Sequence, residues 1–73
     1  MEKFILEGHK FIELYKLLKI EGLASSGGEA KALIAVGQVL VNGVTETQKR
    51  KKIVTGDIIE FNNEKICIQQ EPS

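Results

Sequence analysis

The spacing of apolar residues changes at Gly37, and this change limits the fold more than any other feature of the sequence. Before Gly37, apolar residues recur at intervals of three and four, as on the buried face of a helix. After it they alternate, as in a strand with one buried face. We therefore expect a helix from Lys10 to Glu21, ended by Gly22, and a sheet in the C-terminal half. The apolar positions of this first helix are Phe11, Leu14, Leu17 and Leu18.

A second helix is predicted to begin at Ser26. Three residues later comes Glu29, and together they form a capping box, in which each side chain satisfies a backbone N–H group at the start of the helix. Gly37 can end this helix, because glycine adopts a left-handed conformation without steric penalty. The expected apolar face consists of Ala30, Leu33 and Ile34.

Turn-forming residues divide the rest of the chain into short strands. Asparagine, glycine and aspartate pairs favour tight turns, and the segments between them are rich in β-branched residues. The last of these segments has Ile66 and Ile68 on one face and Cys67 on the other. The expected strands cover residues 3–7, 39–41, 58–61 and 65–69, and the expected turns are Asn42-Gly43, Gly56-Asp57 and Asn62-Asn63.

Chain length and element order together predict one small α+β domain. A chain of 73 residues has room for one modest core, since domains near this size bury only roughly 60% of their unfolded surface. The contents of hydrophobic residues (42%) and charged residues (27%) are those of a folded globular protein. We expect a single domain over residues 1–73, with two packed helices on one face of a small, mainly antiparallel sheet. Phe4, Phe11 and Phe61 are expected in the core, and residues 70–73 as a frayed tail.

Composition excludes several classes of protein. Cys67 is the only cysteine, so an internal disulfide is impossible, and with His9 as the only histidine a four-ligand structural zinc site is excluded too. No apolar stretch approaches the roughly 20 residues that a membrane span needs, and the apolar run near the N-terminus is too short for a signal peptide. We therefore expect a cytoplasmic protein with no metal, cofactor or membrane partner.

No group of residues suggests catalysis. Cys67 lies between two isoleucines in an expected strand, where a structural role is more common than a nucleophilic one. His9 precedes a helix, where a histidine is more often a capping or solvent-exposed residue than a catalytic base. No two carboxylates have a spacing that would bring them together on an expected helix or strand. The glycine-rich stretch at 25–31 lacks the phosphate-loop pattern of nucleotide-binding enzymes. We expect neither enzymatic activity nor a small-molecule substrate.

A formal net charge of zero hides three unlike segments. Residues 1–29 carry a balance of −1, residues 30–52 one of +4, and residues 53–73 one of −3. Salt screens distant charges over about 8 Å, so the four consecutive cations of Lys49–Lys52 can bind phosphates even in a neutral protein. A solvent-exposed loop that keeps the protein soluble explains the four cations almost as well as a phosphate-binding surface does. A protein-interaction module that docks an acidic partner is the alternative function, although an extended run, with cations on two sides, suits a phosphate-lined groove better.

The start of the second helix offers another place for an anion. Gly27 and Gly28 leave backbone N–H groups of the first turn unshielded at the positive end of the helix dipole, and Lys31 follows one turn later. The simpler explanation is that Ser26 and Glu29 only cap the helix, and the Glu29 carboxylate opposes an incoming phosphate. Taken alone, the segment leaves both explanations open.

The order of these motifs resembles a known family. The stretch LYKLLKIEGLASSGGEAKALIAVGQVLVNG, followed by the basic run and VTGDIIEF, is similar over residues 14–61 to the RNA-binding domain first described in ribosomal protein S4, the αL motif. The pieces SGG-x-AK, VLVN and GD-x-x-E resemble the short stand-alone bacterial members of the YbcJ and YaaA type. Two positions depart from the family pattern: Gly27 stands where an arginine is common, and Tyr15 where an aspartate is common.

The resemblance implies a non-catalytic, ribosome-associated protein that binds structured RNA, such as ribosomal RNA, by backbone charge and shape. We expect it to act as a monomer, with the basic run beside the start of the second helix and the acidic C-terminal sheet facing away from the RNA. The scarcity of aromatic residues argues against base stacking. Contact of Glu60 and Glu64 with Lys51 would instead make the run part of an internal salt-bridge network. The implied RNA-binding residues are Ser26, Gly27, Lys31, Gln38, Asn42, Lys49, Arg50, Lys51 and Lys52.

Overall fold

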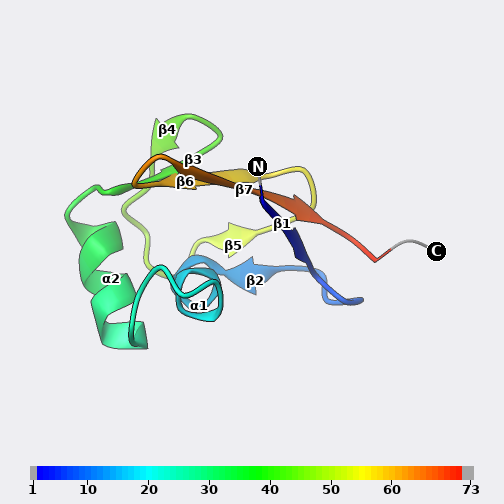
Figure 1. Ribbon diagram of the computed structural model, residues 1–73, viewed down its shortest axis with the longest axis horizontal. Coiled ribbons are helices and arrows are strands. Elements are labelled where there is room, and N and C mark those ends of the chain that lie inside the picture. Colours follow the sequence, from blue (N-terminus) through cyan, green and yellow to red (C-terminus); the bar gives the residue numbers. More distant parts are fainter. Residues whose placement is uncertain (1, 72–73) are drawn as a thin grey trace.

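The computed structural model describes residues 2–71 and has two layers (Figure 1). One layer is a five-stranded sheet with the strand order β1 (Glu2–Ile5), β7 (Glu64–Gln69), β6 (Ile58–Phe61), β3 (Val39–Val41) and β4 (Val44–Thr45). The other layer contains α1 (Leu14–Ile20), α2 (Gly27–Ala35) and a two-stranded sheet of β2 (Ile12–Glu13) and β5 (Lys52–Ile53). Both helices lie on the same side of the larger sheet, which confirms the predicted α+β fold.

The larger sheet is antiparallel except at one edge. Strands β3, β4, β6 and β7 pair antiparallel with their neighbours, whereas β1 pairs parallel with β7. Asn42 and Gly43 have φ values of 53° and 82°, and Asn62 and Asn63 have 52° and 69°. Two consecutive residues of positive φ are the geometry of the tight hairpin turn that these dipeptides favour. The predicted turns are therefore confirmed.

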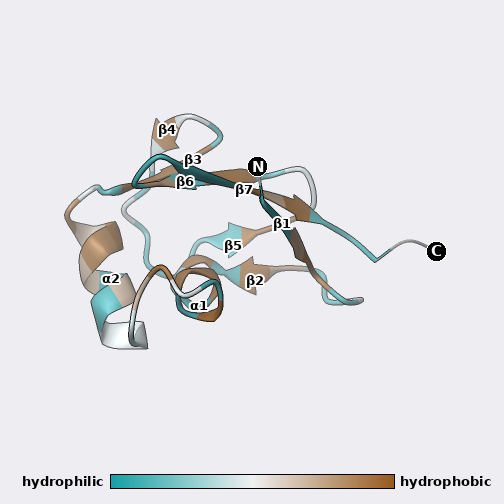
Figure 2. Ribbon diagram, in the orientation of Figure 1, coloured by the Kyte–Doolittle hydropathy of each residue, from teal (hydrophilic) through white to brown (hydrophobic). Residues whose placement is uncertain are grey.

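The core lies between the two layers and is made of aliphatic side chains. In Figure 2 the helices and strands on both sides of the space between the layers contain hydrophobic residues, and the buried ones form one cluster. Phe4 and Phe61 are partly buried and pack against this core, as expected. The expectation for Phe11 was wrong, because its side chain is 41% exposed. Fully buried residues include Leu14, Leu17, Leu18, Ala30, Ile34, Val39, Ile53, Ile59 and Ile68.

The first helix begins at Leu14, four residues later than predicted. Ile12 and Glu13 are instead extended and pair with Ile53 and Lys52 of β5. The apolar periodicity that includes Phe11 is real, but pairing with a distant strand determines the backbone conformation there. The predicted end is confirmed, because Gly22 has a φ of 74° directly after the last turn.

The second helix begins and ends as predicted. Ser26 is the N-cap, and its Oγ accepts a hydrogen bond from the Glu29 N–H at 3.1 Å. The Glu29 carboxylate binds the Ser25 backbone N–H (3.3 Å) and hydroxyl (2.7 Å) rather than the N–H group of the N-cap itself. Gly37, with a φ of 81°, ends the helix. The capping residues and the terminating glycine therefore predicted both ends of α2 correctly.

Gln70, the residue directly after β7, is also fixed in the fold by its side chain. The Gln70 side chain accepts a hydrogen bond from the Gly8 N–H at 2.8 Å and donates one to the His9 carbonyl at 2.9 Å. Gln70, which we expected in a frayed tail, is thus held in the fold, and residues 72 and 73 of that expected tail lie outside the described part of the chain. Within residues 2–71, neither helix has the length and apolar character to cross a membrane.

Candidate nucleic-acid interface

The four cations of Lys49–Lys52, here called the basic segment, lie against the start of α1. Glu13, the N-cap of this helix, makes no capping hydrogen bond with its side chain. Instead the Leu14 N–H donates to the Lys51 carbonyl at 3.0 Å and the Tyr15 N–H to the Lys49 carbonyl at 3.1 Å. The first N–H groups of a helix lack partners within it. The basic segment satisfies two of them, and this fixes its place in the fold.

The basic segment is not extended along its whole length. Lys49 and Arg50 form a turn, the Lys51 N–H donates to the Gln48 carbonyl at 3.2 Å, and only Lys52 belongs to a strand. The argument that an extended run would place cations on two sides therefore applies only to the end of the segment at Lys52. Within the segment, the Arg50 side chain lies over the Tyr15 ring and the Lys52 side chain over the Phe11 ring, so these two charges have different surroundings.

Three cations surround the ring of Tyr15, at the centre of what we call the Tyr15 cluster. The Lys31 ammonium lies 4.7 Å from the ring centroid, the Arg50 guanidinium carbon 5.6 Å and the Lys16 ammonium 5.9 Å. All three distances fall within the roughly 6 Å range of a cation–π interaction. These cations come from α2, the basic segment and α1, so one aromatic ring gathers charges from three elements.

The Tyr15 ring also reaches the first turn of α2. A side-chain carbon placed on Gly27 would lie 3.7 Å from two atoms of the ring. Tyr15 and Gly27 are the two positions at which the sequence departs from the family pattern, and they are neighbours in the structure. The N-terminus of α2 and the basic segment therefore both reach one ring, and the two lie close together, as expected from the sequence.

The first turn of α2 retains backbone donors. The N–H groups of Gly27 and Gly28 have no hydrogen-bond acceptor within residues 2–71. Lys31 is partly buried against Tyr15, one turn further along the helix. The Glu29 carboxylate is held by Ser25. This end of the helix combines two backbone donors and one ammonium group, which is a suitable arrangement for a phosphate oxygen.

The basic segment, the Tyr15 cluster and the first turn of α2 together form what we call the basic face. Its acidic neighbour is Glu13. Its carboxylate lies 3.2 Å from the Lys16 ammonium and 4.0 Å from the Arg50 guanidinium, whose side chain is 67% exposed. Exposed pairs of this kind contribute little, about 0 to 1 kcal/mol, and leave the cations available. Among the described residues, neither Glu60 nor Glu64 forms a salt bridge with Lys51, so the alternative of an internal network is not observed.

Two of the implied binding residues, Gln38 and Asn42, are not among the residues gathered around the Tyr15 ring. Gln38 follows the C-terminal end of α2, a helix of nine residues and hence about 13 Å long. Asn42 uses its side chain within the fold: its Nδ2 donates to the Asp57 carboxylate at 3.0 Å and its Oδ1 accepts from the Ile58 N–H at 2.9 Å. The structure thus brings Ser26, Gly27, Lys31 and the basic segment together at Tyr15, whereas the Asn42 side chain holds the start of β6.

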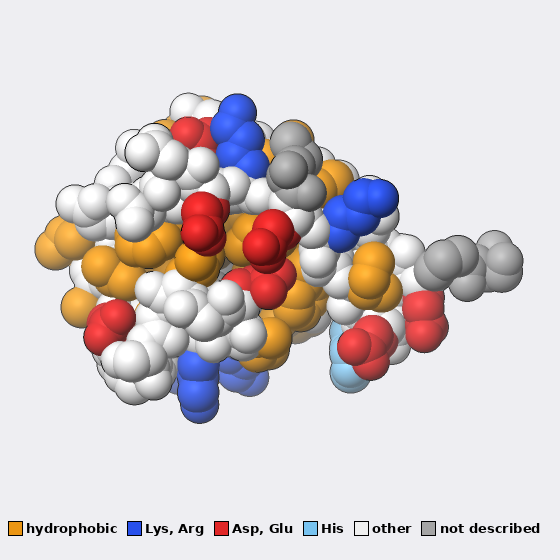
Figure 3. Space-filling model, viewed as in Figure 1, with side chains coloured by type: hydrophobic (Ala, Val, Ile, Leu, Met, Phe, Trp, Pro, Cys, Tyr) orange, Lys and Arg blue, Asp and Glu red, His pale blue; other side chains and the backbone are white. Residues whose placement is uncertain are grey.

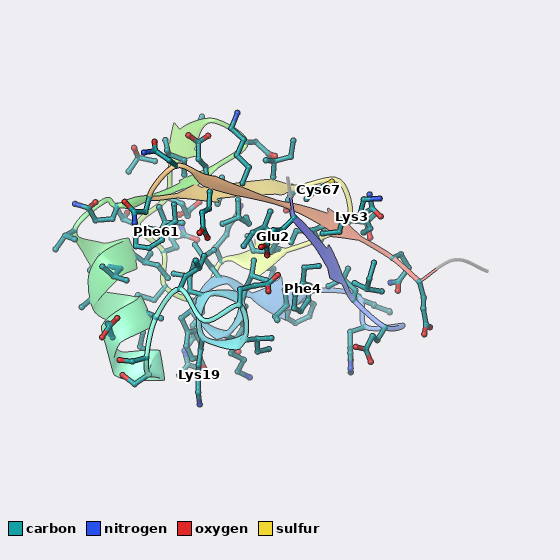
Figure 4. The ribbon with its side chains drawn as sticks, viewed as in Figure 1. Glu2, Lys3, Phe4, Lys19, Phe61 and Cys67 are labelled. Carbon is teal, nitrogen blue, oxygen red and sulfur yellow. The ribbon has the colours of Figure 1, made fainter. Side chains whose placement is uncertain are left out.

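A group of carboxylates lies near the other end of α1. Burial raises the pKa of the Glu21 carboxyl, and the nearby charges of Glu2 and Glu64 raise it further. Figure 3 shows acidic side chains near the middle of the visible face, and Figure 4, in the same view, labels Glu2 there. Glu21 follows the last turn of α1, whereas Tyr15 lies in its first turn. The acidic and basic groups therefore occupy opposite ends of one helix.

Sequence reasoning missed three residues of this face: Phe11, Tyr15 and Lys16. Tyr15 borders the buried stripe of α1, since its neighbour Leu14 is fully buried while Tyr15 is only partly buried. An aromatic residue at such a border is the one available signal in the sequence. The Lys52 ammonium lies 5.1 Å from the Phe11 ring centroid, a second cation–π contact on this face.

The sequence matches the S4 domain family over residues 4–69. YbcJ of Escherichia coli (strain K12) is 51% identical over 61 residues, which cover 84% of this chain and 87% of that protein. A protein of Bacillus subtilis (strain 168) named "Probable ribosome maturation protein RlbA" is 33% identical over 52 residues, or 71% of this chain and 73% of that protein.

Solved structures agree with this assignment. The solution structure of E. coli YbcJ, described as revealing an αL motif involved in RNA binding, matches with a TM-score of 0.72 and 45% identity over 94% of this chain and 87% of that one. The 30S ribosomal protein S4e of Thermoplasma acidophilum matches with a TM-score of 0.59 and 26% identity over 78% of this chain and 30% of that one. The family match over nearly all of the chain, together with the shared fold, shows that the protein belongs to the S4 domain family.

Proposed function

We propose that this protein binds structured RNA, without catalysis, through the basic segment, the Tyr15 cluster and the first turn of α2. The observation that carries the proposal is the gathering of Lys16, Lys31 and Arg50 around one ring. The RNA-binding description of YbcJ, whose structure is similar over 94% of this chain, supports it. We further propose that residues 1–73 act as one module, as a monomer in the cytoplasm.

The chemistry of this face suits phosphates held in a fixed arrangement. Exposed lysine and arginine side chains neutralise phosphates and release counterions, while backbone N–H groups at a helix N-terminus add directional donors. The cations come from different elements, so their spacing is set by the fold rather than by one flexible loop. A set of cations in a fixed arrangement favours a folded RNA, whose phosphates are also fixed in space, over a flexible single strand.

Ribosomal RNA is the class of target that we propose. Two similar proteins support this choice: the relative from B. subtilis carries ribosome maturation in its name, and the archaeal structure is a ribosomal protein. The Tyr15 cluster provides charge and shape complementarity to such an RNA.

A salt series tests the proposed function. If about four to five phosphates are neutralised, the logarithm of the association constant should fall with the logarithm of salt concentration with a slope of roughly −3 to −4. The measurement is fluorescence anisotropy of a labelled ribosomal RNA hairpin between about 0.05 and 0.3 M salt. An acidic polyglutamate peptide serves as the control, because it presents negative charge without the spacing of phosphates. A shallow slope, or equal affinity for the peptide, would contradict RNA binding by this face and favour an acidic protein partner.

A further inference from the structure

A groove of ≈ 520 Å³ opens between β1, the segment that leads into β2, and α1. Its walls are largely apolar: Phe4 and Ile5 come from β1, Phe11 and Ile12 from the opposite side, and Ile20 from α1. Figure 4 shows Phe4 pointing from β1 towards β2 and α1. The volume is that of pockets that hold small ligands or parts of larger ones. Phosphate binding by the basic face leaves this groove without a role.

The groove is continuous with the basic face. Glu13 and Lys16 line it, and the same two residues border the Tyr15 ring through their contacts with Arg50 and with the ring itself. At the groove wall, the Phe11 ring has the Lys52 ammonium 5.1 Å from its centroid. An RNA that follows the basic segment therefore passes the mouth of the groove.

Aromatic residues are too few to stack a run of bases, but the exposed ring of Phe11 has the properties of a stacking surface for a single base. Its side chain is 41% exposed although it is a large apolar ring in a small protein. Unpaired RNA bases are commonly stacked on aromatic side chains beside cations, and such stacking accepts any base because every base has a π-face. The Lys52 ammonium is close enough to the ring for one nucleotide to place its base on Phe11 and its phosphate against Lys52.

We propose that this groove holds one unpaired nucleobase of the bound RNA, stacked on Phe11. The inference rests on the proposed RNA-binding function and makes it more specific: the target is a structured RNA that carries an unpaired nucleotide next to the helical part contacted by the basic segment. Continuity with the basic face favours a nucleobase over an apolar peptide as the occupant.

The test compares two hairpins with the same stem, one fully paired and one with a single bulged 2-aminopurine. The wild-type protein is expected to bind the bulged hairpin about tenfold more tightly, a typical effect of one stacked base, with a change in 2-aminopurine fluorescence. Phe11→Leu keeps an apolar side chain but removes the ring, and should lose both the preference for the bulged over the paired hairpin and the fluorescence change. Phe11→Tyr should keep both. Val36→Ala, at an exposed position outside the groove, is the matched control.

Each outcome separates this inference from the function on which it rests. Wild-type protein that binds both hairpins equally, or Phe11→Leu protein that retains the preference for the bulge, overturns the base pocket while RNA binding stands. If Phe11→Leu protein retains the preference for the bulge, the base does not stack on Phe11, and an apolar protein segment becomes the better candidate occupant of the groove. Failure of the wild type to bind either hairpin overturns both proposals.

Discussion

Replacing all four residues of the basic segment by alanine should lower the affinity for structured RNA about 100-fold at 0.1 M salt, since each lost phosphate contact removes counterion release. The salt slope should fall to roughly −1.5, because Lys31 and Lys16 remain and can still neutralise about two phosphates. The measurement is the same anisotropy titration as for the wild type. This variant should fold, because carbonyl groups of Lys49 and Lys51, rather than their side chains, hold the start of α1.

A matched variant separates position from net charge. Lys3, Lys10, Lys19 and Lys65 are exposed and lie outside the basic segment, and Figure 4 shows Lys3 and Lys19 pointing outward from β1 and α1. Their replacement by alanine removes the same total charge, yet should leave the affinity within about threefold of the wild type, because none of the four belongs to the basic segment or to the Tyr15 cluster and exposed charges outside the interface are screened. Equal losses in the two variants would mean that the basic segment attracts RNA only as part of the overall charge.

Asn42→Ala should lower the free energy of unfolding by about 2 to 3 kcal/mol, the combined effect of two lost side-chain hydrogen bonds and a positive φ that alanine tolerates poorly. Asn42 has a φ of 53°, and its amide holds Asp57 and Ile58 at the start of β6. For 73 residues the whole stability is roughly 4 to 11 kcal/mol, so the loss is large. Urea unfolding monitored by circular dichroism measures it.

Asn63 provides the control for this prediction. It also has a positive φ, 69°, in the other asparagine-containing turn, but within the described residues its side chain has no hydrogen-bond partner. Asn63→Ala should therefore cost only the backbone strain, about 1 kcal/mol. A cost for Asn42→Ala no greater than that for Asn63→Ala would show that the two side-chain hydrogen bonds contribute nothing.

Elements with local signals were predictable from the sequence. The second helix has its N-cap and its terminating glycine next to it in the chain, and the two hairpins have asparagine and glycine at the positions of positive φ. These residues act on backbone that is within a few positions, so no knowledge of the tertiary structure is needed. The start of α1 differs, because Ile12 and Glu13 pair with a strand 40 residues away.

The candidate site was predictable in its charges but not in its centre. The basic segment and the start of α2 stand out separately in the sequence, each with a simpler alternative explanation. Their proximity depends on Tyr15, whose contacts with Gly27, Lys31 and Arg50 all span long stretches of chain. Gln38 and Asn42, which the resemblance implied, are not among the residues that gather around the Tyr15 ring, and their part in RNA binding stays a prediction.

A nuclear magnetic resonance titration tests the location of the RNA interface most directly. Adding a structured ribosomal RNA hairpin to ¹⁵N-labelled protein should shift the amide signals of residues 26–31 and 49–52 and of Tyr15, where the cations and the helix donors meet. The amides of Glu2, Glu21 and Glu64, in the acidic group near the far end of α1, should remain unchanged. Shifts concentrated on those three acidic residues, with the basic segment unaffected, would contradict the interface described here.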